Sequence, residues 1–97
     1  MPLRYTFKSS FQKTFDKLPY SKQILATKAL EALQTYFEAG EASYGLRIKK
    51  LHDGLTAKTF EARISLDLRI VWVQSKEEII FALLGNHDDV LRFIKNL

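Results

Sequence analysis

Three consecutive runs decide the fold of this chain: TFEARIS (Thr59–Ser65), LDLRIVWVQS (Leu66–Ser75) and EEIIFALLGNHDDV (Glu77–Val90). Each run is rich in β-branched, aromatic or other apolar residues, and only short connections separate them. Short connections favour antiparallel pairing, because a parallel pair needs a crossover of a dozen or more residues. The sequence therefore predicts an antiparallel meander on which the rest of the chain packs.

Arg69 is the unusual residue of the second run. Alternation along a strand places it on the same face as Val71 and Val73, among apolar neighbours. Burying an unpaired guanidinium is expensive. We therefore expect Arg69 to reach an acidic partner, a groove or an anionic ligand.

Length and composition predict one globular domain over residues 1–97. The chain is 46% hydrophobic and 12% aromatic, which is typical of a folded core rather than of disorder. It has no cysteine, so it has no disulfide, thiol nucleophile or thiolate metal site, which fits a reducing compartment. We expect no metal site, no small-molecule cofactor, no membrane segment and a cytoplasmic location. A net charge of +4 favours an acidic partner, either nucleic acid or an acidic polypeptide.

Two helices are predicted after a half-buried first strand over residues 3–8, which we place at or next to a sheet edge. The first helix begins at Ser9, whose spacing to Gln12 is that of a capping box, and Pro19 ends it. The second runs from a Ser21 cap to about residue 39, where Gly40 ends it. Its predicted apolar stripe is Leu25, Ala29, Ala32, Leu33 and Tyr36. The two helices should form a hairpin laid over one face of the sheet.

The remaining segments complete an α+β fold. A flexible joint is expected over residues 41–45, followed by a short strand or an extended loop over 46–51 and a turn at Asp53 and Gly54. A short C-terminal helix should begin at Asp88 or Asp89. The predicted architecture is an N-terminal strand and a helical hairpin on a twisted, mainly antiparallel sheet, with a basic cleft on the other face.

Cations collect in and beside the predicted meander. Arginine offers a planar fork to phosphate oxygens and lysine a mobile point charge, so this group is a candidate phosphate-binding surface. A solvated strand face is the alternative, with Arg63 paired to Glu61 and Arg69 paired to Asp67 or to a helix carboxylate. The cationic group consists of Arg47, Lys49, Lys50, His52, Lys58, Arg63 and Arg69.

His87 is the candidate for proton transfer. It follows the last predicted strand, where loops commonly present functional groups, and an imidazole titrates near neutral pH. The alternative is an ordinary hydrogen-bonding histidine in a turn.

The order of elements and several short motifs resemble the RelE/ParE superfamily of bacterial toxin–antitoxin systems across essentially the whole chain. The motifs are Lys50 with Leu51, the aromatic-X-X-Arg step Phe60–Arg63, the strand Arg69–Trp72 and the ending Gly85–Val90. The resemblance implies a RelE-like fold, a cognate antitoxin protein as partner, and a metal-independent endoribonuclease that cleaves mRNA on the ribosome. A branch of the same fold inhibits DNA gyrase without catalysis, and an inactive binding module is a third possibility.

The resemblance also implies roles for individual residues. Arg69 matches the arginine that binds the scissile phosphate, Arg63 a basic residue of the cleft, and His87 a proton donor; these are the predicted catalytic residues. Lys49 stands near the position of a glutamate base in some members, and Leu91 near that of a tyrosine, so both groups are missing here. Glu61, Asp88 or the ribosome are the candidates for the second proton transfer. The predicted RNA-binding residues are Arg47, Lys49, Lys50 and Lys58.

Overall fold

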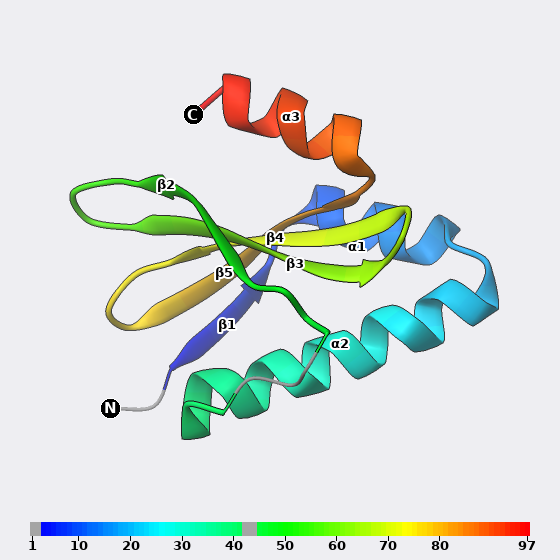
Figure 1. Cartoon of the computed structure of the whole chain (residues 1–97), viewed down its shortest axis with the longest axis horizontal. Helices are drawn as coiled ribbons and strands as arrows, with labels where there is room; N and C mark the ends of the chain where they lie inside the picture. The colour runs from blue at the N-terminus through cyan, green and yellow to red at the C-terminus, as the bar shows by residue number, and fades with distance from the viewer. Residues whose placement is uncertain (1–2, 42–44) are drawn as a thin grey trace.

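The computed structural model describes residues 3–41 and 45–97. Residues 42–44, the middle of the joint predicted over 41–45, lie outside them. The described elements, in chain order, are β1 (Arg4–Phe7), α1 (Ser9–Lys17), α2 (Tyr20–Ala39), β2 (Lys49–Asp53), β3 (Lys58–Ser65), β4 (Leu68–Gln74), β5 (Glu78–Gly85) and α3 (His87–Lys95) (Figure 1).

The sheet confirms the predicted meander and its mainly antiparallel pairing. The strands lie in the order β1-β5-β4-β3-β2, and all neighbours are antiparallel except β1, which pairs parallel to β5. β1 forms one edge of the sheet, as predicted. Of the two possibilities left open for residues 46–51, the strand is realised from Lys49 onward, and it continues to Asp53.

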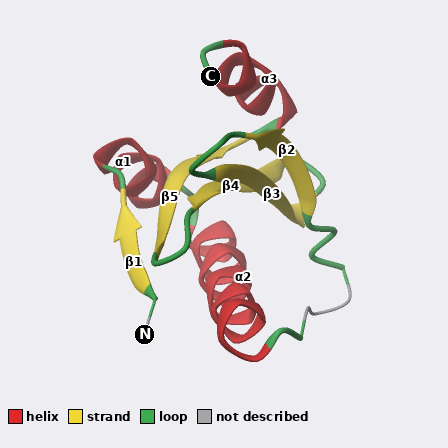
Figure 2. Cartoon of the chain, turned by 90° about the vertical axis from the view of Figure 1, so that its left-hand side faces the viewer, coloured by secondary structure: helices red, strands yellow, loops and turns green. Residues whose placement is uncertain are grey.

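Helices cover both faces of the sheet. α2 lies on one side and α3 on the other in two perpendicular views, and α1 packs against β5 beside α2 (Figures 1 and 2). The core lies between the sheet and the α1–α2 hairpin, where Trp72, Ile70 and Leu33 are fully buried. The α+β architecture follows the prediction. No helix in the described part of the chain has the length and apolar character of a membrane span.

Both predicted N-terminal caps of the hairpin are wrong, although its boundaries are nearly right. The N-cap of α1 is Lys8, whose ammonium group cannot accept a helix N–H, and its backbone carbonyl accepts the Gln12 N–H at 3.1 Å. α2 begins one residue after Pro19, whose carbonyl accepts the backbone N–H groups of residues 22 and 23, so Ser21 is inside the helix. Gly40 ends α2 as predicted, in the left-handed conformation at φ 78°.

The apolar stripe of α2 is rotated relative to the prediction. The buried positions are Ala26, Ala29 and Leu33, whereas Leu25 is 42% exposed. Phe37 fixes this rotation, because its ring packs edge-on against Trp72 with 5.4 Å between the ring centroids. Leu25 therefore lies at the rim of the helix–sheet contact.

Candidate functional site

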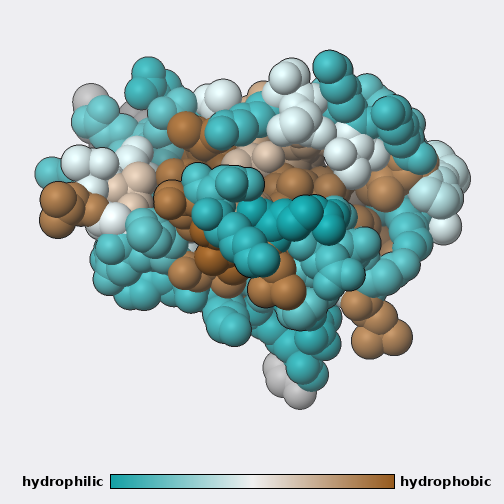
Figure 3. All heavy atoms as spheres, turned by 90° about the horizontal axis from the view of Figure 1, so that it is seen from above, coloured by the Kyte–Doolittle hydropathy of each residue, from teal (hydrophilic) through white to brown (hydrophobic). Residues whose placement is uncertain are grey.

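The candidate site lies on the face of the sheet that carries α3. Trp72 and Ile70 point toward the α1–α2 hairpin, so Val71 between them points to the opposite face, where α3 contacts β4 and β5. Val71 is nevertheless fully buried, as is expected beneath α3. Figure 3 looks onto this side of the molecule and shows a hydrophilic band across the middle, bordered by hydrophobic side chains. The α3 face is thus partly covered rather than an open basic sheet.

Two arginines lie side by side on this face. The register of β3 and β4 pairs Arg63 directly with Arg69. Arg63 lies beyond the part of β3 that pairs with β2, which begins at Lys49. Its backbone N–H donates to the carbonyl of Leu46, in the segment before β2, at 2.7 Å. Like charges directly opposite each other destabilise a sheet, so this pair calls for a compensating anion.

Glu61 supplies that anion. Arg69 Nη1 donates to Glu61 Oε2 at 3.0 Å, and the two side chains are only 18% and 9% exposed. The sequence alternative with Arg63 paired to Glu61 and Arg69 to Asp67 is therefore wrong, because the register brings Arg69 diagonally across from Glu61. An acidic partner for Arg69, one of the three expected outcomes, is confirmed.

Asp67 has a different partner. It accepts hydrogen bonds from the ammonium group of Lys22 on α2 and from the hydroxyl of Ser65. These bonds, the one from Lys22 foremost, hold the pKa of the Asp67 carboxyl below its usual range. This ion pair ties the β3–β4 turn to the start of α2.

The cluster around Glu61 keeps an excess of positive charge. Lys49 on β2 lies directly across from Glu61, and neither Lys49 nor Arg63 forms an ion pair with a described residue. Three cations, Lys49, Arg63 and Arg69, and one carboxylate leave a net charge of +2. In addition, Arg69 Nε is buried and has no hydrogen-bond partner among the described residues. The cluster can therefore attract an anion, while Glu61 fixes one of its arginines in place.

α3 begins beside this cluster, at a tight and well-capped turn. Asn86 caps the helix through reciprocal hydrogen bonds with Asp89, both 2.9 Å long, so Asp88 and Asp89 do not begin it as predicted. Gly85 allows the close approach, because a Cβ there would lie 2.6 Å from the Asp89 carboxylate. The lack of a side chain at Gly85 thus lets α3 turn back over the end of β5.

His87 is the first residue of α3 and is exposed to solvent. Its Nδ1 lies 3.9 Å from Asp88 Oδ1, and its side chain is 62% exposed. Gly85 is the β5 partner of Arg69, and His87 follows two residues later. Two residues span at most roughly 7 Å of chain, so the His87 backbone lies within about 12 Å of that of Arg69. The structure thus places Arg63, Arg69 and His87 at the same end of the sheet.

The structure does not bring the other predicted RNA-binding lysines to this cluster. Lys58 pairs with Gln74, five residues along β3 from Arg63, which corresponds to roughly 17 Å. Lys50 donates to Asp53 at 3.1 Å near the β2–β3 turn. Of the predicted RNA-binding group, Lys49 lies across from Glu61. Arg47 is an exposed residue with φ 49° that follows Leu46, the backbone partner of Arg63.

Glu61 is the residue whose importance sequence reasoning underestimated. It entered the prediction as one candidate for a proton transfer and as an alternative partner of Arg63, yet it is the direct partner of Arg69. The observed β3–β4 register makes Glu61 and Arg69 diagonal neighbours on one face of the sheet. The sequence does not specify this register. Elsewhere in residues 3–41 and 45–97, no three His, Asp or Glu side chains come close enough to hold a metal ion.

Comparison with known structures identifies the fold. A chain of the archaeal RelE–RelB complex from Pyrococcus horikoshii superposes with a TM-score of 0.69 at 17% identity, covering 89% of this chain and 96% of that one. The chain has the RelE-like fold. The YoeB dimer from Staphylococcus aureus gives a TM-score of 0.67 at 21% identity, covering 90% and 99% of the two chains. The Escherichia coli DinJ–YafQ complex gives 0.65 at 13% identity, covering 91% and 97%.

Sequence comparison adds no relative: no protein-family model matches the chain, and neither does any curated protein. The RelE-like fold is therefore established by structure, across nearly the whole length of each neighbour. At these identities the likeness concerns the arrangement of elements, and the roles of individual residues rest on the geometry described above.

Proposed function

We propose that this chain is the toxin of a toxin–antitoxin pair and that it cleaves translated mRNA as an endoribonuclease in the cytoplasm. The observation that carries the proposal is the Arg63–Arg69 pair, which the register places side by side at the end of the sheet where His87 begins α3. The RelE-like fold, whose solved examples include toxin–antitoxin complexes, supports the same proposal.

The proposed chemistry is attack of the ribose 2′-hydroxyl on the neighbouring phosphate. Negative charge grows on the phosphate oxygens in the transition state, and fixed cations stabilise it best when they need not reorganise. Arg69 meets that condition because Glu61 holds its guanidinium at 3.0 Å. Arg63, which has no ion-pair partner among the described residues, is the cation that contacts the phosphate directly.

His87 is the proposed acid for the leaving 5′-oxygen. Its imidazole is exposed and lies two residues after Gly85, the β5 partner of Arg69, so it is near a phosphate held by the arginine pair. Lys49, beside Glu61, holds the next phosphate of the RNA and sets its position. The 2′-hydroxyl gives up its proton as it attacks, and Glu61, Asp88 beside His87, or the ribosome is the proposed acceptor of that proton. The proposed reaction needs no metal or cofactor.

The proposed partner in the cell is an antitoxin with an acidic or amphipathic segment. The proposed site has a net charge of +2 on a chain of net charge +4, so it attracts an acidic segment. Such a segment bound over the site would block access of RNA and inhibit the toxin. Affinity purification of the tagged chain co-expressed with the product of its neighbouring gene should recover a complex. Recovery of the tagged chain alone would count against this partner.

A non-catalytic inhibitor of DNA gyrase is the second candidate. The observation in its favour is that Arg69 is largely buried in its ion pair, while the His87 side chain is exposed and lies 3.9 Å from the Asp88 carboxylate. In that case Arg69 would serve only to stabilise the sheet. His87 would be an ordinary surface residue, and neither would act on RNA.

Pulse labelling after induced expression in bacteria separates these two candidates. A prompt loss of amino-acid incorporation supports the ribonuclease, whereas a replication or DNA-damage response with continued protein synthesis supports the gyrase inhibitor. Arg63→Ala should abolish the effect on protein synthesis. Arg4→Ala is the matched control, because it removes the same charge from an exposed position on β1, at the far edge of the sheet.

A further inference from the structure

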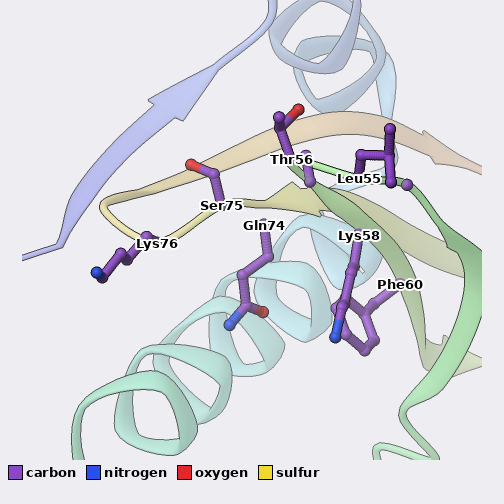
Figure 4. A pocket seen from close by; sticks show the side chains of 9 residues that line it. Leu55, Thr56, Lys58, Phe60, Gln74, Ser75 and Lys76 are labelled. Atoms are coloured by element: carbon purple, nitrogen blue, oxygen red, sulfur yellow. The ribbon is translucent and has the colours of Figure 1, made fainter.

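A cavity lies at the opposite end of the sheet from the arginine pair. It has a volume of about 330 Å³ and is formed between the β2–β3 turn and the β4–β5 turn (Figure 4). Lys58, Phe60 and Gln74 belong to its lining, and so does Lys76 in the β4–β5 turn. Its volume is at the lower end of the range for small-molecule sites, enough for a group the size of one nucleotide.

Two side chains of this cavity, Lys58 and Gln74, offer hydrogen-bond donors to a ligand. Lys58 and Gln74 are directly opposite each other on β3 and β4, and Figure 4 shows both side chains extending to the same side of the strands. Trp72 Nε1 lies 3.3 Å from Gln74 Oε1, and an indole N–H can only donate. The Gln74 carbonyl is therefore occupied, which leaves its NH₂ group for a ligand. The Lys58 ammonium group and the Gln74 NH₂ suit a ligand rich in acceptor oxygens.

Lys58 is only loosely held by the protein. Its ammonium group is 3.9 Å from Asp53, whose closer partner is Lys50 at 3.1 Å, and the Lys58 side chain is 53% exposed. Hydrogen bonding to Lys50 is the main cause that lowers the pKa of Asp53. Lys58 can thus turn toward an anion in the cavity without leaving a carboxylate unpaired.

Phe60 adds a flat apolar surface whose orientation is fixed. Its ring stacks on Trp72 with 5.7 Å between centroids and 17° between planes, and Trp72 is fully buried against Phe37. Phe60 itself is half-buried and lines the cavity beside Lys58. An aromatic surface next to cations is the combination that binds single-stranded nucleic acid, because bases stack on the ring while phosphates meet the cations.

We propose that this cavity binds one unpaired nucleotide of RNA, with its phosphate at Lys58, its base against Phe60 and a base carbonyl accepting from Gln74. The inference rests on the proposed ribonuclease function, since it gives the same chain a second RNA contact. The cavity is roughly 17 Å from Arg63 along β3, and its side chains lie on the opposite face from the arginine pair. The nucleotide can belong to the mRNA substrate or to ribosomal RNA.

Binding is tested without catalysis. A fluorescein-labelled, 2′-O-methylated hexanucleotide cannot be cleaved, and its affinity for the purified chain is read by anisotropy. Lys58→Ala, Gln74→Ala and Phe60→Leu should each weaken binding about fivefold or more, which is the effect expected for loss of one stacking or phosphate contact. Lys58→Ala should also reduce the slope of log K against log salt by about 0.7. Lys13→Ala, an exposed lysine on α1, is the charge-matched control and should have little effect.

A second arm identifies the source of the nucleotide. Weaker binding of the hexanucleotide by the three variants supports a site for the mRNA, whereas unchanged hexanucleotide binding with reduced co-sedimentation with ribosomes supports a site for ribosomal RNA. If the variants match Lys13→Ala in both assays, or if Lys58→Ala alone differs, the cavity is not a nucleotide site. Because Lys58 and Gln74 are far from Arg63 and the ligand is uncleavable, these results do not depend on whether the chain cleaves RNA.

Discussion

Replacing Glu61 with glutamine isolates the ion pair at the centre of the proposed site. Glu61→Gln keeps the size of the side chain but removes the charge that Arg69 faces at 3.0 Å. Breaking a buried ion pair by neutralising one partner costs about 3 to 5 kcal/mol, because the other charge stays buried without compensation. Arg69 is 18% exposed and keeps some contact with water, so we expect the low end, about 3 kcal/mol. For a domain of this size that loss lowers Tm by roughly 12 °C or more.

The double variant Glu61→Gln/Arg69→Met separates stability from function. With both charges gone, neither member of the buried pair is left without its partner, and stability should return to within about 1 kcal/mol of the original chain. Activity should not return, because the cation that stabilises the phosphate has been removed. Thermal unfolding followed by circular dichroism gives the first result, and amino-acid incorporation in a cell-free translation system gives the second.

Two outcomes would refute this reasoning. An unchanged Tm for Glu61→Gln would show that the pair does not hold Arg69, and full inhibition of translation by the refolded double variant would show that Arg69 takes no part in catalysis. Asp53→Asn is the matched control, since it removes the carboxylate of an exposed ion pair on β2 and should leave Tm almost unchanged.

Three further predictions concern the start of α3 and the β1 edge. His87→Ala should slow cleavage by roughly 10² to 10⁴ and remove one limb of the pH–rate profile, so an unchanged profile would exclude the imidazole as the acid. Asn86→Ala loses the side-chain oxygen that accepts the Asp89 N–H and should cost about 1 kcal/mol in urea unfolding, whereas an Asn86→Asp variant should keep most of the stability. Burial, and then the hydrogen bond to Glu38, raise the pKa of Tyr5 to about 12. The stability that Tyr5 contributes should therefore be complete below pH 10 and disappear as the pH rises toward 12, and absorbance titration of Tyr5→Phe should lack the latest-ionising phenol.

Local patterns predicted the elements well because each rests on a few neighbouring residues. Alternation over Phe60–Ser65 and Leu68–Val73 located two central strands, and Gly40 marked the end of α2. The N-terminal caps were wrong because Pro19 and Lys8 supply the first helical carbonyls, a role that depends on backbone conformation rather than on side-chain chemistry.

The pairing of charges was not predictable in the same way. Arg69 meets Glu61 only because β3 and β4 pair with Arg63 opposite Arg69, and a shift of one residue would turn every side chain of a strand to the other face. The separation of Lys58 from the arginine pair likewise follows from distance along the strand, although these residues belong to one basic stretch in the sequence. Motif resemblance proposed Arg63, Arg69 and His87, and the fold gathers those three at one end of the sheet.

The most direct test of the central claim is to map the ends of an mRNA translated in a cell-free system after the purified chain is added. We expect new 5′ ends within the coding region and 2′,3′-cyclic or 3′ phosphates at the matching cut. We expect this cleavage with the original chain and with Arg4→Ala but not with Arg63→Ala, although all three have the same Tm. Intact mRNA with the original chain, or equal cleavage by Arg63→Ala, would contradict the assignment of the Arg63–Arg69 pair as the catalytic centre of a ribonuclease.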